Sequence, residues 1–173
     1  TIVSTRNPFG LTSAVRGKDV KDNKSMLKVY SSGGIGWIDE DEVNPKLPLI
    51  NRHKVFVGKV LSGHLGETDE QGQVKVIATI QTAEPMSVCT DSYLLIGNFS
   101  TAEEAYNLSA YLRTKTLRYL LLQALASMNI SRANFRFVPL LDFTRSWTDE
   151  ELYRRFQLSE VEIQTIEQTI KPM

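Results

Sequence analysis

The stretch from residue 101 to Met128 contains neither proline nor glycine, and it constrains the fold more than any other part of the chain. Just before it, Ser100-Thr-Ala-Glu103 has the spacing of a capping box, in which a serine and a glutamate satisfy the first free amides of a helix. We therefore predict one long helix from this box to Met128, about 40 Å long at a rise of 1.5 Å per residue. Leu108 and Leu112 fall near one stripe of this helix, which indicates a face that packs against a sheet.

Strand patterns precede this helix, and one follows it. The segments with β-branched, aromatic or alternating apolar residues are 26–30, 54–61, 73–81, 93–97 and 135–138. The glycine-rich segment 33–36 predicts a turn after the first of them. Strands first, then a long helix, another strand and two short helices make an α+β pattern rather than a doubly wound sheet. We expect a mixed or antiparallel sheet packed on the long helix, with two short C-terminal helices.

Two further capping boxes open the short C-terminal helices. They are Thr148-Asp-Glu-Glu151 and Ser159-Glu-Val-Glu162. We divide the chain into an α+β domain over residues 1–147 and a helical appendage over residues 148–173, packed on the same domain. The length of 173 residues suits one compact domain of this kind.

The net charge is zero, with 20 basic and 20 acidic side chains, but the charges are unevenly distributed. Residues 1–65 hold ten basic and six acidic side chains, and residues 101–147 hold six and three. Residues 66–100 and 148–173 are acidic instead. Because the field near a protein face depends on charges within about 10 Å at 0.1 M salt, the basic blocks can still form a phosphate-facing surface.

Basic and aromatic side chains on predicted loops are the candidate contacts with nucleic acid. Arginine and lysine neutralise phosphates, and arginine, asparagine, serine and histidine also read base edges. The residues expected to contact phosphates are Arg16, Lys18, Lys21, Lys24, Arg52 and Lys54. Those expected near bases are Ser32, Trp37 and His53. For Arg113, Lys115 and Arg118 on the long helix, a solvated face and phosphate contact remain equally good interpretations.

The sequence predicts no catalytic or metal centre. His53, His64 and the single Cys89 cannot build a four-ligand zinc site without carboxylates, and no G-x-S-x-G motif is present. We interpret His64, in a loop sequence, as a solvated side chain. Gly33-Gly34-Ile35-Gly36 lacks the lysine–serine pair and the helix of a phosphate-binding loop.

Hydropathy predicts a protein that is independent of membranes. No apolar run reaches the roughly 18 residues of a membrane helix, and no signal peptide is visible. The lone Cys89 excludes an internal disulfide. We expect a cytoplasmic protein, and a start at Thr1 rather than Met fits a fragment of a longer chain.

Several segments, taken in order, are similar to one protein family. They are Thr5-Arg-Asn-Pro-Phe-Gly-Leu11, Val88-Cys-Thr-Asp-Ser-Tyr-Leu-Leu-Ile-Gly97, Leu112-Arg-Thr-Lys-Thr-Leu-Arg118, Phe137-Val-Pro-Leu-Leu-Asp-Phe143 and Trp147-Thr-Asp-Glu-Glu-Leu-Tyr153. Together they resemble the C-terminal target-recognition region of type II-like restriction–modification N6-adenine DNA methyltransferases, over almost the whole chain. The resemblance implies a region that grips duplex DNA and selects the sequence whose adenine is flipped into a catalytic domain.

The catalytic motifs of that family are missing from this chain. Asn7-Pro8-Phe9-Gly10 lacks the second proline and the final aromatic residue of N/D-P-P-Y/F, so no catalytic residue is carried over. The resemblance implies a non-catalytic fragment whose partners are double-stranded DNA and the N-terminal methyltransferase domain of the same parent chain. S-adenosylmethionine would be the cofactor of that parent, an adenine-specific enzyme, and not of the fragment.

Two further expectations concern the C-terminal part of the chain. By ordinary burial preference, Phe143, Trp147 and Tyr153 should be packing anchors rather than base-stacking groups. The alternative function is a protein–protein docking module of a restriction–modification complex, with the apolar and acidic C-terminal helices as the contact face.

Overall fold

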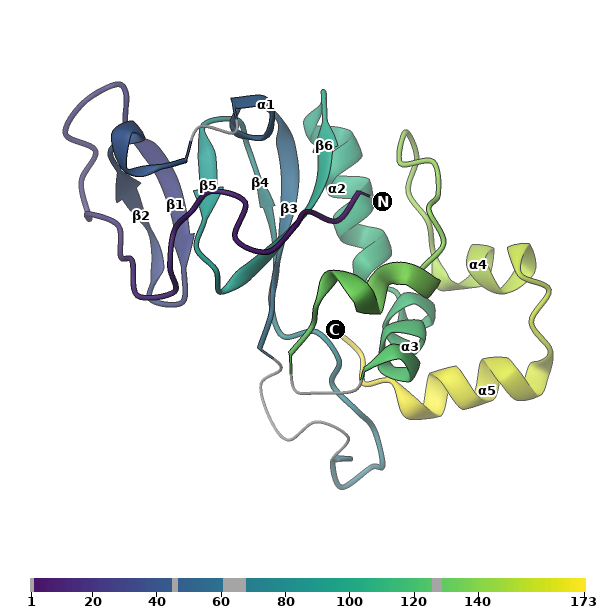
Figure 1. Cartoon of the computed structure of the whole chain (residues 1–173). Coiled ribbons are helices and arrows are strands. Elements are labelled where there is room, and N and C mark those ends of the chain that lie inside the picture. The colour runs from purple at the N-terminus through teal and green to yellow at the C-terminus, as the bar shows by residue number, and fades with distance from the viewer. Residues whose placement is uncertain (1, 45–46, 61–67, 126–128) are drawn as a thin grey trace.

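The computed structural model describes residues 2–44, 47–60, 68–125 and 129–173, and it is a mixed α/β structure (Figure 1). The strands are β1 (Leu27–Ser31), β2 (Gly34–Ile38), β3 (His53–Gly58), β4 (Ile80–Ala83), β5 (Ser87–Cys89) and β6 (Tyr93–Phe99). The α-helices are α1 (Leu47–Ile50), α2 (Ala102–Arg113), α3 (Lys115–Ala124), α4 (Asp149–Arg155) and α5 (Glu160–Thr169). Two 3₁₀ helices are η1 (Glu40–Glu42) and η2 (Arg132–Phe137). The predicted α+β class is therefore confirmed.

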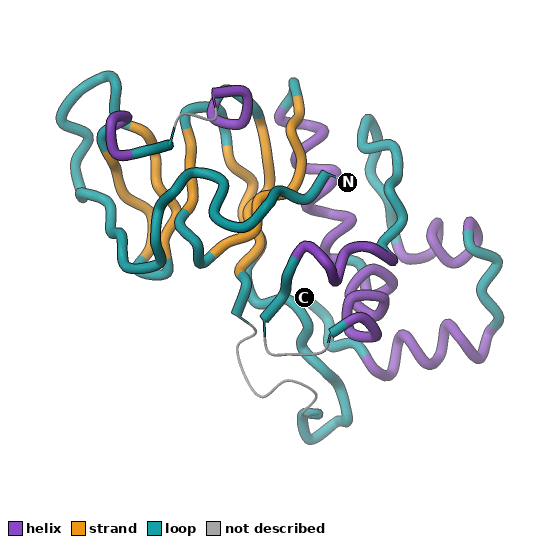
Figure 2. Tube along the Cα trace, viewed as in Figure 1, coloured by secondary structure: helices purple, strands orange, loops and turns teal. Residues whose placement is uncertain are grey.

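The strands form two three-stranded sheets rather than one. In the order β2-β1-β5, β1 pairs antiparallel with β2 and parallel with β5. In the order β4-β3-β6, both pairs are antiparallel. Figure 2 shows the first sheet at one end of the molecule and helices α4 and α5 at the other.

The second sheet lies between the first sheet and the helices because β3 is apolar on both faces. Val55 and Val57 belong to the apolar cluster that contains α2 and α3. Phe56, which points the other way, belongs to the cluster that contains β1 and β5. All three side chains are fully buried. Continuous burial along a strand is the pattern of a layer that is covered on both sides.

The predicted long helix is two helices that meet at Thr114. This residue has extended geometry (ψ 147°), and its side chain accepts from the amide of Leu117 and so begins α3. The hydroxyl also donates to the Tyr111 carbonyl at 2.7 Å, which satisfies the end of α2. The break needs no proline or glycine because one threonine closes the first helix and opens the next. The predicted end at Met128 lies outside the described residues.

The first capping box is shifted by one residue from its predicted place. Thr101 and Glu104 make both bonds of the box, rather than Ser100 and Glu103. The Ser100 hydroxyl instead accepts a hydrogen bond from Arg52 at 2.5 Å. The predicted boxes of α4 and α5, at Thr148 and Ser159, are both present.

Three of the predicted extended and turn segments differ in the structure. Of the predicted strand 73–81, only the end from Ile80 enters a sheet; Val74 instead makes an isolated parallel bridge with Ile170. Residues 135–138 fall mostly in the 3₁₀ helix η2, not in a strand. The glycine-rich turn at 33–36 is largely strand β2. Val74 and β2 pair with residues outside their predicted segments, whereas η2 is closed by bonds among residues 131–138.

The C-terminal helices pack on the body through α3. Leu152 of α4 and Ile170 after α5 belong to the same apolar cluster as α2 and α3. Contacts link α3 with both C-terminal helices. The division at residue 147 stays a prediction. Among the described residues, no helix is long and apolar enough to cross a bilayer.

Candidate nucleic-acid interface

A close approach of two glycines builds the surface that carries most of the predicted DNA contacts. Residues 12–21, called the arm here, run beside β2, and Lys18 and Trp37 exchange backbone hydrogen bonds of 2.7 and 2.9 Å. A Cβ on Gly17 would lie 2.6 Å from the backbone of Gly36, and a Cβ on Gly36 would lie 2.7 Å from that of Gly17. Only glycine at both positions lets the arm lie against the strand.

The arm brings Arg16 and Lys21 onto the β1–β2 hairpin. The Arg16 guanidinium donates to the carbonyls of Ser13 (2.7 Å) and Val15 (2.8 Å). Its side chain packs on Gly33, where a Cβ would lie 2.6 Å from the arginine Nε. Lys21 Nζ lies 4.7 Å from the centroid of the Trp37 ring, in a cation–π contact. We call this surface, with the exposed Ser32 at the hairpin turn, the hairpin face.

Acidic neighbours compensate one of the four cations on the arm and just after it. Lys18 Nζ lies 3.0 Å from Asp39 and 3.7 Å from Asp22. The hydrogen bond between Lys18 and Asp39 raises the pKa of the lysine and lowers the pKa of the carboxyl. Lys24 is exposed and makes no ion pair with any described residue. The charges that remain for a ligand are therefore those of Arg16, Lys21 and Lys24.

Three predicted site residues do not belong to the hairpin face. Arg52 and His53 lie at the start of β3 in the second sheet, where Arg52 is bonded to Ser100 and His53 pairs with Phe99. Lys54 is fully buried, so the prediction that it contacts phosphate is wrong. Its ammonium is satisfied inside the protein.

The ammonium of Lys54 binds backbone carbonyls inside the protein. It donates to the carbonyls of Ile50 (3.1 Å), Arg52 (2.8 Å) and Glu84 (3.4 Å). Burial lowers the pKa of Lys54 to about 8. These three bonds join α1, β3 and the end of β4, which gives the residue a structural role.

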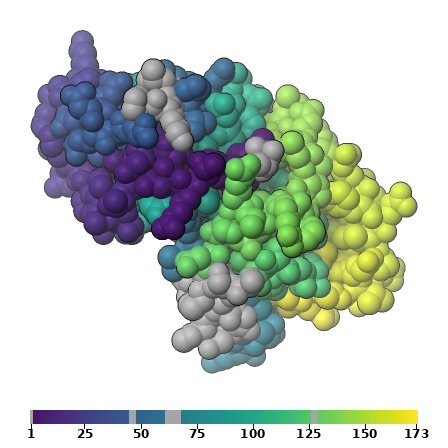
Figure 3. Space-filling model, in the orientation of Figure 1, coloured from purple at the N-terminus to yellow at the C-terminus, as the bar shows by residue number. Residues whose placement is uncertain are grey.

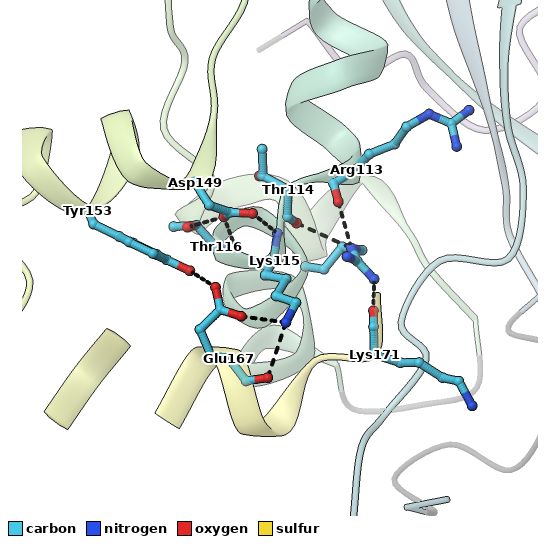
Figure 4. Close-up of polar contacts among 9 residues, drawn as sticks. Arg113, Thr114, Lys115, Thr116, Asp149, Tyr153, Glu167 and Lys171 are labelled. Carbon is cyan, nitrogen blue, oxygen red and sulfur yellow. Dashed lines mark hydrogen bonds and ion pairs between the residues drawn. The ribbon is translucent and has the colours of Figure 1, made fainter. Parts of the chain in front are cut away.

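The basic residues at the α2–α3 junction are also structural (Figure 4). Arg118 is 2% exposed, and its Nε donates to the carbonyls of Arg113 and Thr114. Its Nη1 donates to the Lys171 carbonyl at 2.6 Å. Lys115 Nζ donates to the Glu167 carboxylate at 2.5 Å, and Arg113 donates to a backbone carbonyl of β4. Neither a solvated face nor a phosphate contact fits Arg118, which is buried, whereas Arg113 is exposed and Lys115 is partly buried.

Asp149 completes this junction, and the sequence did not single it out. Its carboxylate accepts the amides of Lys115 (2.9 Å) and Thr116 (2.8 Å) at the start of α3. Hydrogen bonds from Lys115 and Tyr153 lower the pKa of Glu167. The box Thr148–Glu151 places Asp149 in the first turn of α4, but nothing in the sequence indicates which amides it would reach.

The aromatic residues expected to be packing anchors fulfil that prediction. Phe143 is buried in the apolar cluster with Tyr111, at a ring distance of 5.7 Å. Trp147 is 8% exposed, and its Nε1 donates to the Asp142 carbonyl at 2.8 Å. The guanidinium of Arg145 lies 3.9 Å from the Trp147 ring centroid. Tyr153 is partly buried, and its hydroxyl donates to Glu167.

The described residues contain no metal-ligand cluster of three or more His, Cys, Asp or Glu side chains. His64 lies outside the described residues. In segment 33–36, the Arg16 side chain lies against Gly33 and the backbone of Gly17 lies against Gly36, whereas a Cβ at Gly34 would meet nothing within 4 Å. Comparison with known proteins finds no family model, curated protein or solved structure that matches the chain.

Proposed function

We propose that this chain is the DNA target-recognition region of a restriction–modification N6-adenine DNA methyltransferase. The observation that carries the proposal is the hairpin face, where the Gly17–Gly36 contact gathers Arg16 and Lys21 beside the exposed turn at Ser32. The resemblance of the ordered segments to that family supports the same function. In the parent enzyme, S-adenosylmethionine and the catalytic motif belong to the methyltransferase domain.

The shape of the hairpin suits duplex DNA. The major groove of B-DNA admits a two-stranded β-ribbon. The β1–β2 pair is such a ribbon, with five residues in each strand and β2 at the edge of its sheet. Cations at its side neutralise phosphates, whereas Ser32 and the exposed Ile35 at the turn approach base edges.

Binding to a fluorescein-labelled duplex of random sequence, followed by anisotropy at several salt concentrations, tests this function. The double variant Arg16→Glu/Lys21→Glu should weaken binding, and it should reduce the slope of log affinity against log salt by about 2, at roughly 0.9 per phosphate contact. Lys75→Glu/Arg154→Glu is the matched control, since both of its residues are exposed and lie off the hairpin face. Equal losses in the two double variants, or a flat salt response of the unmodified chain, would refute the proposal.

A second candidate function is favoured by an apolar groove at the other end of the molecule. The groove, of about 480 Å³, lies between α3, η2 and the C-terminal helices. Phe137 (59% exposed) and Val161 (73% exposed) contribute to it, with Glu162 at its edge. We propose that the groove binds an amphipathic, basic segment of the parent methyltransferase domain. The positive charge of such a segment would complement the acidic first turn of α5.

Charge reversal separates the two functions. Assembly with the separately produced methyltransferase domain should survive Arg16→Glu/Lys21→Glu but should weaken in Val161→Asp. If the hairpin variant leaves DNA binding intact and Val161→Asp disrupts assembly, the docking function replaces the DNA-binding function.

A further inference from the structure

A second cleft carries charged groups that the hairpin face does not use. It has a volume of about 590 Å³ and lies between the N-terminal segment and η2. In Figure 3, teal residues are visible in this hollow, between the purple N-terminal segment and the green region near residue 130. The charged side chains that line it are Arg6, Lys59, Asp91 and Arg132.

Asp91 lies at the centre of this charged group. Its Oδ2 accepts from Arg6 Nε (3.1 Å) and Nη2 (3.0 Å), and its Oδ1 accepts from Lys59 Nζ. Although burial opposes it, hydrogen bonds from Lys59 and Arg6 hold the pKa of Asp91 below its usual range. One ionised carboxylate therefore serves two cations.

The cleft retains unused hydrogen-bond donors and a net positive charge. Among the hydrogen bonds between described residues, Arg6 uses Nε and Nη2 on Asp91 and leaves Nη1 unused, and Lys59 uses one of its three ammonium hydrogens. Arg132 on the opposite side is exposed and makes no ion pair with any described residue. Three cations against one carboxylate leave two positive charges on the lining, next to the hydroxyls of Ser13 and Ser92.

The cleft adjoins the hairpin face. Ser13 lines the cleft, and its carbonyl accepts the 2.7 Å hydrogen bond from Arg16. The amide of Asp91 donates to the Leu11 carbonyl at 2.8 Å, which fixes the base of the arm against the cleft. A chain of phosphates that contacts Arg16 can therefore continue into the cleft.

We propose that this cleft binds a phosphate group through Arg6, Lys59 and Arg132, and that the group is a backbone phosphate of duplex DNA. Arginine and lysine donors around an anion give the short, charge-assisted hydrogen bonds typical of phosphate sites. The identity of the phosphate as DNA backbone rests on the proposed function, whereas the anion site itself rests on the geometry of the cleft.

Two substitutions with opposite expected effects test the cleft. Arg132→Ala should weaken binding of the labelled duplex and reduce the salt slope by about 0.9, the value of one lost phosphate contact. Asp91→Asn should strengthen binding, because it removes the one negative charge and frees Arg6 and Lys59. Arg154→Ala, an exposed arginine outside the cleft, is the matched control. Thermal unfolding shows whether Asp91→Asn folds, and Arg132→Ala alters an exposed side chain and tests the cleft independently.

Titration with inorganic phosphate, followed by amide NMR shifts at Ser92 and Arg132, separates DNA from a free phosphate as the source. Saturable shifts that disappear in Arg132→Ala support the anion site. If they occur while Arg132→Ala binds duplex as the control does, the site takes a free phosphate and the DNA assignment is overturned. If phosphate leaves these signals unmoved and Arg132→Ala matches the control, the cleft proposal fails. In that case loss of DNA binding in Arg16→Glu/Lys21→Glu still supports the proposed function.

Discussion

The arm and the α2–α3 junction are both rich in basic residues in the sequence, but the structure uses their charges in opposite ways. On the arm, Lys21 lies over the ring of Trp37, and Arg16 bonds carbonyls of its own loop. At the junction, Arg118 is buried and bonds carbonyls of Arg113, Thr114 and the C-terminal segment.

The difference shows what decides whether a cluster of basic residues is available to a ligand. The junction lies where one helix ends and another begins, so unpaired carbonyls are concentrated there and attract guanidinium and ammonium groups. On the arm, Arg16 bonds two carbonyls of its own turn, and Arg16, Lys18 and Lys21 are all exposed. Each region holds three basic residues, and among the bonds between described residues only those of the junction reach backbone carbonyls of other segments.

The largest expected loss of stability comes from replacing Arg118, the buried arginine of the junction. Arg118→Ala leaves the carbonyls of Arg113, Thr114 and Lys171 without their donor, and should lower the free energy of unfolding by about 3 kcal/mol. Arg16→Ala, at an exposed position, should change it by less than about 0.5 kcal/mol. Urea unfolding of both variants measures the difference. Similar losses would remove the distinction between the two regions.

Lys54 belongs with the buried group, and its titration sharpens the comparison. Its pKa is about 8 in the folded protein and 10.5 in an unfolded chain, so the unfolded state binds more protons between these values. The unfolding free energy should therefore rise with pH across this window, by at most about 3 kcal/mol. Lys54→Met cannot show this rise, because it has no ammonium group at this position. Subtracting its unfolding free energy from that of the unmodified protein at each pH removes the contribution of the other titrating groups. A constant difference from pH 8 to 10.5 would show that the Lys54 ammonium is solvated.

Gly36→Ala tests whether close backbone contact holds the arm in place. The added methyl group would lie 2.7 Å from the Gly17 backbone, which should force the arm from β2 and cost about 2 kcal/mol. Trp37 fluorescence should change and duplex affinity should fall. Ser32→Ala, at the exposed turn nearby, is the control for stability, with an expected change below about 0.5 kcal/mol. Unchanged fluorescence and affinity in Gly36→Ala would contradict this account of the arm.

The smallest expected effect compares one cation from each region in DNA binding. Lys21→Ala should reduce the salt slope by about 0.9, and Arg113→Ala should leave the slope unchanged. Anisotropy titrations at several salt concentrations measure both slopes per folded molecule. A lower slope in Arg113→Ala alone would place the DNA on the helical side instead.

Local patterns predicted the elements whose stabilising bonds lie within a few residues. The boxes at Thr148 and Ser159 were correct because a serine or threonine side chain and a glutamate three residues later cap the same helix. Segment 26–30 was also correct, apart from a shift of one residue. The box at Ser100 failed by one residue, where Arg52, 48 positions away, bonds the serine hydroxyl.

Most of the candidate interface needed tertiary information. The sequence placed Arg16, Lys18 and Lys21 on one loop, and the structure brings that loop to Trp37 through the pair Gly17 and Gly36. The phosphate cleft was not predicted, because Arg6, Asp91 and Arg132 come from three distant segments. Their spacing carries no periodic signal that a sequence pattern could detect.

Hydrophobic periodicity and caps within one turn of the chain were enough to predict the α+β class, the two C-terminal helices and the position of the first strand. The division into two sheets and the break at Thr114 depend on long-range packing and could not be predicted in this way. Long-range packing also decided which basic residues are buried, as at Lys54 and Arg118, and which are exposed. The physical reason is that a buried charge depends on acceptors supplied by other segments, and the carbonyls around Lys54 and Arg118 are brought there only by folding.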